Sequence, residues 1–168
     1  MPAATNKTKN AFLFQPKDRT LVLSYLGVAF AAIFIGAVAG VLQTLERTGY
    51  ITLPSPSLYY QLLTIHGVMM ALIFTTFFIV GFVLAGSART LDGELPPASR
   101  ASAWAGFWIM TVGTATAAIF ILTDDASVLY TFYAPMQADP FFYVGLALVV
   151  VGSWLSGIAV FNAYARWK

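Results

Sequence analysis

The chain has 168 residues and a formal net charge of +2; 59% of the residues are hydrophobic and only 10% are charged. Because soluble domains carry about 25% charged residues, this composition excludes an ordinary water-soluble domain and predicts a protein that lies in a lipid bilayer. The absence of cysteine excludes disulfides, iron–sulfur clusters and thiolate metal sites within the chain. We expect no nucleic-acid partner.

Four long apolar runs predict four transmembrane helices. The runs cover residues 21–45, 58–86, 101–122 and 141–164, and each reaches the ~20 residues that cross about 30 Å of hydrocarbon. Backbone polar groups in lipid must be paired within the segment, so these spans are expected to be helical. The predicted fold class is all-α, a polytopic membrane protein whose residues 1–168 form a membrane domain.

The first run contains Gly36 and Gly40, and the fourth run contains Ser153 and Gly157. Both pairs have the small-xxx-small spacing that lets two membrane helices approach closely. We therefore expect tight helix packing at both pairs, which by itself indicates no particular function.

The second run carries the only histidine of the chain, His66, in the stretch YYQLLTIHGVMMALIFTTFF. It lies roughly 12 Å along the helix from Leu58, below the membrane interface, at ~1.5 Å per residue. Ionisable residues at such depth are rare and mark functional sites by default. Two interpretations stay open on periodicity alone: a hydrogen bond to a neighbouring helix, or an axial ligand of a haem iron.

Local sequence favours the haem. Gly67 removes a side chain where a flat ring could approach, and six apolar or aromatic residues lie three, four or seven positions from His66 on the same helical face. These six are Tyr59, Leu62, Leu63, Met69, Met70 and Ile73. A six-coordinate haem needs a second ligand, for which Met110 or Met136 is a candidate in this chain; otherwise the ligand comes from another part of the protein.

The connection between the third and fourth runs, TDDASVLYTFYAPMQADP, is unusually aromatic, as expected also for an interfacial aromatic belt.

The distribution of charge predicts the orientation of the helices. Eight basic residues fall on one side: Lys7, Lys9, Lys17, Arg19, Arg89, Arg100, Arg166 and Lys168. The other side has only Arg47, together with Asp124, Asp125 and Asp139. By the positive-inside rule both termini are cytoplasmic, and the protein is expected in the cytoplasmic membrane as a multi-pass protein.

Two stretches resemble a known family. YYQLLTIHGVMMALIFT is similar to the second helix of subunit I of haem–copper oxidases, in which a His-Gly pair carries an axial ligand of the low-spin haem. The amino-acid sequence of this stretch is most similar to the B-type branch, the ba-type cytochrome c oxidases. VLYTFYAPMQADPFFYVGLALVVVGSWLSG resembles the outer connection and fourth helix of that branch, although its usual Tyr-Pro-Pro stands here as Tyr133-Ala134-Pro135.

The resemblance implies that His66 binds the iron of a low-spin haem b beside Gly67. It also implies that Tyr130 and Tyr133 lie near the haem propionates. The chain would be the N-terminal part of a cytochrome c oxidase, passing electrons from cytochrome c or a similar donor to a haem–copper centre that reduces oxygen to water.

The resemblance also implies what lies outside the chain: the remaining helices of subunit I, with the high-spin haem and copper, and a copper-containing subunit II. Those helices could belong to the same gene product or to a separate chain. Three alternatives remain open at this point: a nitric oxide reductase of the same superfamily, a non-redox membrane anchor or assembly subunit, and a small cytochrome b that uses His66 and a methionine.

Overall fold

The computed structural model describes residues 15–91, 94–129, 132 and 134–167. In chain order its helices are α2 (Pro16–Arg47), α3 (Pro56–Gly67), the π-helix η1 (Val68–Phe74), α4 (Thr75–Thr90), α5 (Pro97–Leu122) and α6 (Pro140–Trp167). The described residues contain no strand, so the prediction of an all-α fold is confirmed. The four apolar runs fall inside α2, the continuous segment α3–η1–α4, α5 and α6.

Each of these four segments begins at a proline: Pro16, Pro56, Pro97 and Pro140. Proline suits the first helical position because its fixed φ is helical and its missing N–H has no intrahelical acceptor there. At the start of α3, the Ser55 hydroxyl also accepts a hydrogen bond from Leu58 N at 3.2 Å. The helices therefore start upstream of the apolar runs, at residues that a hydropathy window does not register.

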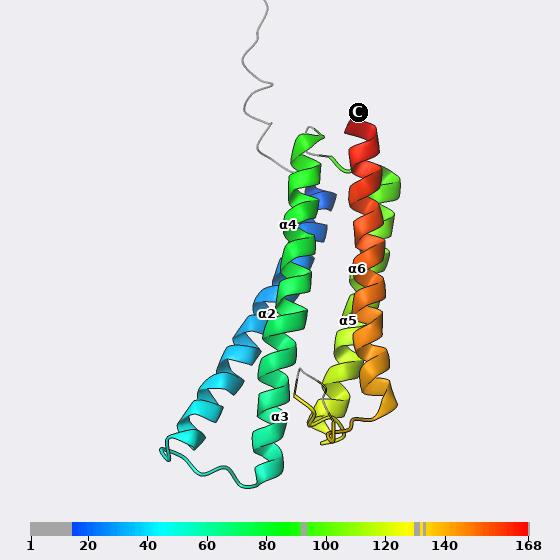
Figure 1. Ribbon diagram of the computed structural model, residues 1–168. Coiled ribbons are helices and arrows are strands. Elements are labelled where there is room, and N and C mark those ends of the chain that lie inside the picture. Colours follow the sequence, from blue (N-terminus) through cyan, green and yellow to red (C-terminus); the bar gives the residue numbers. More distant parts are fainter. Residues whose placement is uncertain (1–14, 92–93, 130–131, 133, 168) are drawn as a thin grey trace, which may run out of the picture.

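All four segments are long and apolar enough to cross a membrane. They alternate in direction, so that the start of α2, the end of α4 and the end of α6 lie at the same end of the molecule (Figure 1). At the opposite end, α2 diverges from α3, and a short connection closes the gap between them (Figure 1). The orientation of this bundle in a membrane stays a prediction.

Helices α5 and α6 pack most closely, and glycines make their approach possible. A Cβ added at Gly113 would lie 2.5 Å from the Gly145 carbonyl oxygen, and one added at Gly152 would lie 2.7 Å from that of Gly106. The predicted contact at Ser153 and Gly157 is wrong, because no neighbouring atom lies within 4 Å of a Cβ placed at Gly157. The contact uses small residues seven positions apart, one heptad, and not the four-residue spacing.

A buried tyrosine links three helices. The Tyr25 hydroxyl on α2 donates to the Ala103 carbonyl on α5 at 2.7 Å and lies 2.7 Å from the Ser156 hydroxyl on α6. Ser156 in turn donates to the Gly152 carbonyl at 3.0 Å. Since Tyr25 is fully buried, these bonds satisfy a polar group that an apolar interior could not otherwise accommodate.

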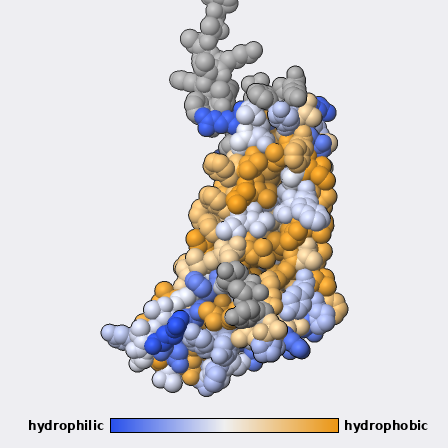
Figure 2. All heavy atoms as spheres, in the orientation of Figure 1, coloured by the Kyte–Doolittle hydropathy of each residue, from blue (hydrophilic) through white to orange (hydrophobic). Residues whose placement is uncertain are grey.

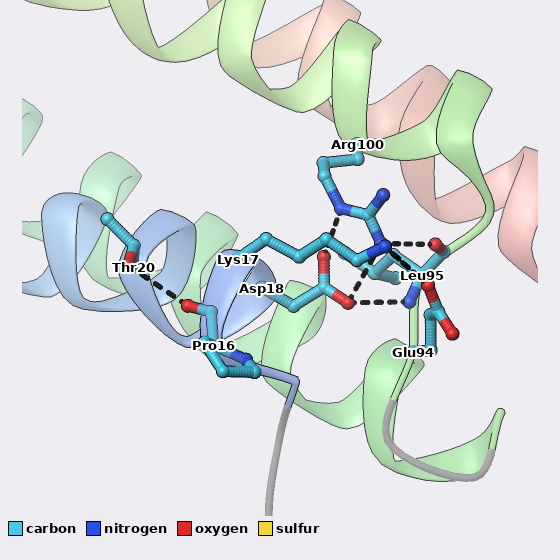
Figure 3. Close-up of polar contacts among 7 residues, drawn as sticks. All are labelled: Pro16, Lys17, Asp18, Thr20, Glu94, Leu95 and Arg100. Carbon is cyan, nitrogen blue, oxygen red and sulfur yellow. Dashed lines mark hydrogen bonds and ion pairs between the residues drawn. The ribbon is translucent and has the colours of Figure 1, made fainter.

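A buried ion pair fastens the start of α2 to the start of α5 (Figure 3). Asp18 is fully buried, and its carboxylate accepts from Arg100 Nε at 2.5 Å, from Arg100 Nη2 at 3.1 Å and from Leu95 N at 2.9 Å. Glu94 pairs with Lys17 at 2.7 Å beside it, and this hydrogen bond holds the pKa of the Glu94 carboxyl below its ordinary value. The carboxylate of Asp18 thus has three donors that compensate its removal from water.

The surface suits an apolar surrounding. Large apolar side chains are strongly exposed along several helices, among them Phe34, Phe82 and Phe161, which are about 70% exposed. Apolar residues dominate the middle of the face in Figure 2, and the most hydrophilic residues gather at its two ends. Such a surface needs lipid or further helices against it, because soluble monomers rarely expose large contiguous apolar patches.

Candidate functional site

His66 lies one residue before the end of α3, and its ring meets α2. The ring Nδ1 is 2.8 Å from the carbonyl oxygen of Gly36. A carbonyl only accepts, so Nδ1 must carry the proton and donate it. In the neutral imidazole this leaves Nε2 deprotonated, with a lone pair that can bind a metal.

The two glycines of α2 make room for this arrangement. A Cβ added at Gly40 would lie 2.7 Å from Nδ1 and 2.8 Å from Cε1 of His66. A Cβ added at Gly36 would lie 2.5 Å from Cγ of Met70. The close packing predicted for Gly36 and Gly40 is confirmed, and its purpose is specific: the imidazole ring rests on the bare backbone of α2.

A groove of about 590 Å³ opens beside the ring between α2 and the second span. Its described lining consists of Ala37, Gly40, Val41, Gln43, Thr44, Leu45, Arg47, Leu63, His66 and Met70. The volume falls within the ~300–1,000 Å³ of small-molecule and cofactor sites, which are mostly apolar with a few placed polar groups. The groove therefore combines a metal-binding nitrogen with room for an apolar ligand.

The π-helix η1 starts two residues after His66 and changes which side chains line the groove. Of the six residues predicted as an apolar wall, Leu63 and Met70 border the groove, whereas Met69 and Ile73 are buried in the helical core. For Met69 and Ile73 the prediction is therefore wrong, and Tyr59 and Leu62 are not among the described residues that line the groove. It assumed α-helical spacing beyond His66, but a π-helix bonds residue i to i+5 and rotates each following side chain to another position.

Gly67, the last residue of α3, is half-buried and has ordinary helical angles, φ −65° and ψ −50°. Its role beside a flat ring stays a prediction. Met110 is fully buried in α5, with its Cγ 2.6 Å from a Cβ placed at Gly152 of α6, and Met136 packs against the core from the connection. Neither methionine is among the described residues that line the groove, so neither is positioned to be a second ligand.

Tyr130 and Tyr133 lie outside the described residues. Their described neighbour Leu129 donates from its backbone N to the Thr64 hydroxyl at 2.9 Å. Thr64 precedes His66 by two residues, about 200° around the helix, so this anchor holds the connection on the side of α3 away from the groove.

The same connection has a second anchor near the start of α3. The Ser57 hydroxyl donates to the Asp124 carboxylate, which also accepts from Ser127 at 2.7 Å. The bond from Ser57 holds the pKa of the Asp124 carboxyl below its ordinary value, and the bond from Ser127 acts in the same direction. The segment that follows α5 is thus tied to α3 at two points.

Sequence reasoning missed three polar residues of the groove, Gln43, Thr44 and Arg47. The side-chain amide of Gln43 donates to the Ala39 carbonyl at 3.2 Å and to the Leu62 carbonyl at 2.9 Å, so it joins α2 to α3 next to His66. A lone glutamine in the apolar run VLQTL was a signal that could have been used. From the sequence, Arg47 was noted only as the one basic residue on the side opposite the other eight. No group of three or more potential ligands of His, Cys, Asp or Glu type occurs in the described part of the chain.

Comparisons with known proteins show the family to which the chain belongs. The family model described as cytochrome c and quinol oxidase polypeptide I matches residues 20–168. Cytochrome c oxidase subunit 1 of Thermus thermophilus is 32% identical over 158 residues, covering 90% of this chain and 28% of that protein. A haem–copper terminal oxidase dimer solved by cryo-electron microscopy superposes with a TM-score of 0.83 at 34% identity, over 92% of this chain and 26% of the solved one. The chain thus spans little more than a quarter of the length of these relatives.

Proposed function

The chain belongs to the family of cytochrome c and quinol oxidase polypeptide I, and from this premise we propose that it is the N-terminal part of the catalytic subunit of a haem–copper terminal oxidase. Within that subunit His66 is an axial ligand of the low-spin haem b. The observation that carries the proposal is the hydrogen bond from His66 Nδ1 to the Gly36 carbonyl, which leaves Nε2 for iron at the edge of an apolar groove.

The residues of the groove fit a haem in three respects. The Gly36 carbonyl fixes the tautomer and orientation of the imidazole and makes the ring a stronger donor, as outer-shell partners of metal-bound histidines generally do. Gly40 lets the Nδ1–Cε1 edge of the ring approach α2 closely. Leu63 and Met70 supply apolar walls that keep water from the ligand and so influence the potential of the iron. A bound haem would supply one-electron transfer, and this chain would hold and tune it.

The remaining parts of the proposal concern the whole protein. Electrons come from cytochrome c or a similar donor, and oxygen is reduced to water at a high-spin haem and copper held by helices outside this chain. A copper-containing subunit II and the cytoplasmic membrane complete the assembly, with both termini of the chain cytoplasmic. Gly67 borders the haem, and Tyr130 and Tyr133 lie near its propionates.

The decisive experiment separates an interhelical hydrogen bond from iron ligation. In the purified complex, His66→Asn retains an amide N–H that can reach the Gly36 carbonyl, but it offers iron no imidazole. We expect the low-spin haem band in the reduced-minus-oxidised spectrum to be lost in His66→Asn, and to return when imidazole is added. A low-spin band that persists in His66→Asn at full intensity would show that another residue binds the iron.

The reaction itself is tested by turnover. The proposal requires oxygen consumption with a reduced cytochrome donor, and preferential turnover of nitric oxide would favour a nitric oxide reductase of the same superfamily. Tyr130→Phe and Tyr133→Phe test the tyrosines, since loss of a hydroxyl near a propionate should lower the midpoint potential of the low-spin haem without removing its band.

A further inference from the structure

One cation lies at the mouth of the His66 groove without a counter-ion among the described residues. Arg47 is the last residue of α2; it is exposed, and it lines the same groove as His66. Resting on the function proposed above, we infer that the Arg47 guanidinium binds a carboxylate at this mouth, and that this carboxylate is a propionate of the haem held by His66.

The hydrogen-bond donors of the groove support this assignment. Gln43 donates both amide hydrogens to backbone carbonyls, and Thr44 donates its hydroxyl hydrogen to the Gly40 carbonyl at 2.9 Å. His66 donates the hydrogen of Nδ1 to the Gly36 carbonyl. The other described lining residues except Arg47 have apolar side chains. Arg47 is therefore the one described lining side chain with donors left for a ligand, and it has five of them in a planar fork that suits a carboxylate.

The described acidic residues do not neutralise Arg47. No Asp or Glu is among the described residues that line the groove. The adjacent Glu46 borders a second hollow together with Arg47, but its carboxylate accepts from Leu53 N at 2.7 Å and so is directed into the connection between α2 and α3. The guanidinium thus remains available at a place where the groove opens.

The spacing along α2 matches an amphiphilic ligand. Gly40 touches the imidazole, and Arg47 follows seven residues later, a rise of ~10 Å along the helix axis. Between these two positions the groove presents Val41, Leu45 and Leu63. A ligand that bridges the two ends must combine a metal centre, a flat apolar body and a terminal anion, and a haem has all three. A lipid phosphate could also pair with an arginine at a helix end, but it contains no metal centre for His66 to bind.

Arg47→Gln in the complete complex tests the inference, and Arg47→Lys restores the charge. Arg19→Gln, at the exposed opposite end of α2, is the control for the loss of one positive charge. We expect Arg47→Gln to retain the low-spin haem but to lower its midpoint potential, because removal of a nearby cation favours the oxidised iron. With the ~10 Å rise between Gly40 and Arg47 taken as the separation of the charge from the iron, and an effective dielectric of ~20, the ratio of oxidised to reduced haem at a fixed potential should rise roughly tenfold, equivalent to ~59 mV.

A second measurement identifies the anion. Redox-difference infrared spectra of complex containing haem labelled with ¹³C in its propionates should show a propionate band that shifts in Arg47→Gln and not in Arg19→Gln. An unchanged propionate band and an unchanged potential would overturn the inference. So would a shift in potential seen in phosphatidylcholine nanodiscs but absent in a phosphate-free maltoside detergent, because the partner would then be a lipid phosphate.

Failure of this inference and failure of the proposed function give different results. If His66→Asn removes the low-spin haem while Arg47→Gln changes neither its potential nor its propionate band, the inference about Arg47 fails alone. If His66→Asn leaves the low-spin haem intact, the proposed function itself fails.

Discussion

The substitution Gly40→Ala places one methyl group against the proposed iron ligand. Its Cβ would lie 2.7 Å from Nδ1 and 2.8 Å from Cε1 of His66, where ordinary contacts begin near 3.4 Å. The ring must therefore move by about 0.7 Å, which is larger than the whole range of good N–H···O distances, ~2.7–3.2 Å. The bond from Nδ1 to Gly36 should weaken, and the direction in which Nε2 points should change.

Two magnitudes follow. Overpacking a well-packed contact costs about 1–3 kcal/mol of stability, and the loss of an outer-shell partner typically lowers metal affinity or activity ~10–100-fold. We expect Gly40→Ala to lose low-spin haem, measured as the pyridine haemochrome and the low-spin band of the purified complex, and to unfold at a lower temperature. Gly27→Ala is the matched control, because Gly27 is an exposed glycine of the same helix with no atom within 4 Å of an added Cβ.

The control should be neutral or stabilised by about 0.5–1 kcal/mol, the usual gain when alanine replaces a helical glycine. If Gly40→Ala keeps an unaltered low-spin spectrum and unfolds like Gly27→Ala, the imidazole is not confined by α2 and the reasoning about the groove is refuted. If Gly40→Ala lowers the unfolding temperature but leaves the spectrum unaltered, Gly40 serves helix packing alone.

Three further predictions concern the frame around the site. Asp18→Asn should destabilise the chain by about 3–5 kcal/mol in thermal or denaturant unfolding, because it breaks a buried ion pair and leaves the Arg100 guanidinium without its carboxylate; stability equal to the native chain would contradict this. Tyr25→Phe should cost about 1–3 kcal/mol in the same assay, since a buried carbonyl loses its donor, and an unaltered midpoint would show that the bond contributes nothing. The pKa of the Asp124 carboxyl is depressed in the folded chain, so its bond with Ser57 should stabilise the connection above the ordinary carboxyl range and be lost as the pH falls through the lowered pKa. Hydrogen exchange of that connection should accordingly rise on acidification in the native chain and be high at every pH in Ser57→Ala, and a native chain without pH dependence would count against the bond.

The helical spans were predictable because hydrocarbon imposes a strict rule on apolar length. The helix starts were not, because each is set by a proline upstream of its apolar run, such as Pro97, and proline weighs little on a hydropathy scale. Small residues gave a mixed result. Gly36 and Gly40 lie at a helix contact as predicted, whereas Gly157 does not. Spacing on one helix says which residues share a face, but not which face meets a neighbour.

The candidate site likewise contains some features that the sequence predicts and others that depend on tertiary structure. His66 could be selected from sequence, since a lone imidazole in an apolar run is rare. The position of Arg47 in the same groove could not, because it depends on how α2 crosses α3, which only tertiary structure provides. The tautomer of His66 was equally inaccessible, as it is set by a carbonyl thirty residues away in the chain.

The π-helix explains how one helix can serve both the core and the groove. In a continuous α-helix, Met69 and Ile73 would follow His66 at i+3 and i+7 and share its face. Here both are buried in the core, and Met70, at i+4, borders the groove with His66. The wider turn of η1 therefore separates a packing face from a ligand face immediately after the histidine, so that the core can be filled without occupying the space beside the imidazole. Segments of this kind are frequent at functional sites, and this one begins two residues after the proposed iron ligand.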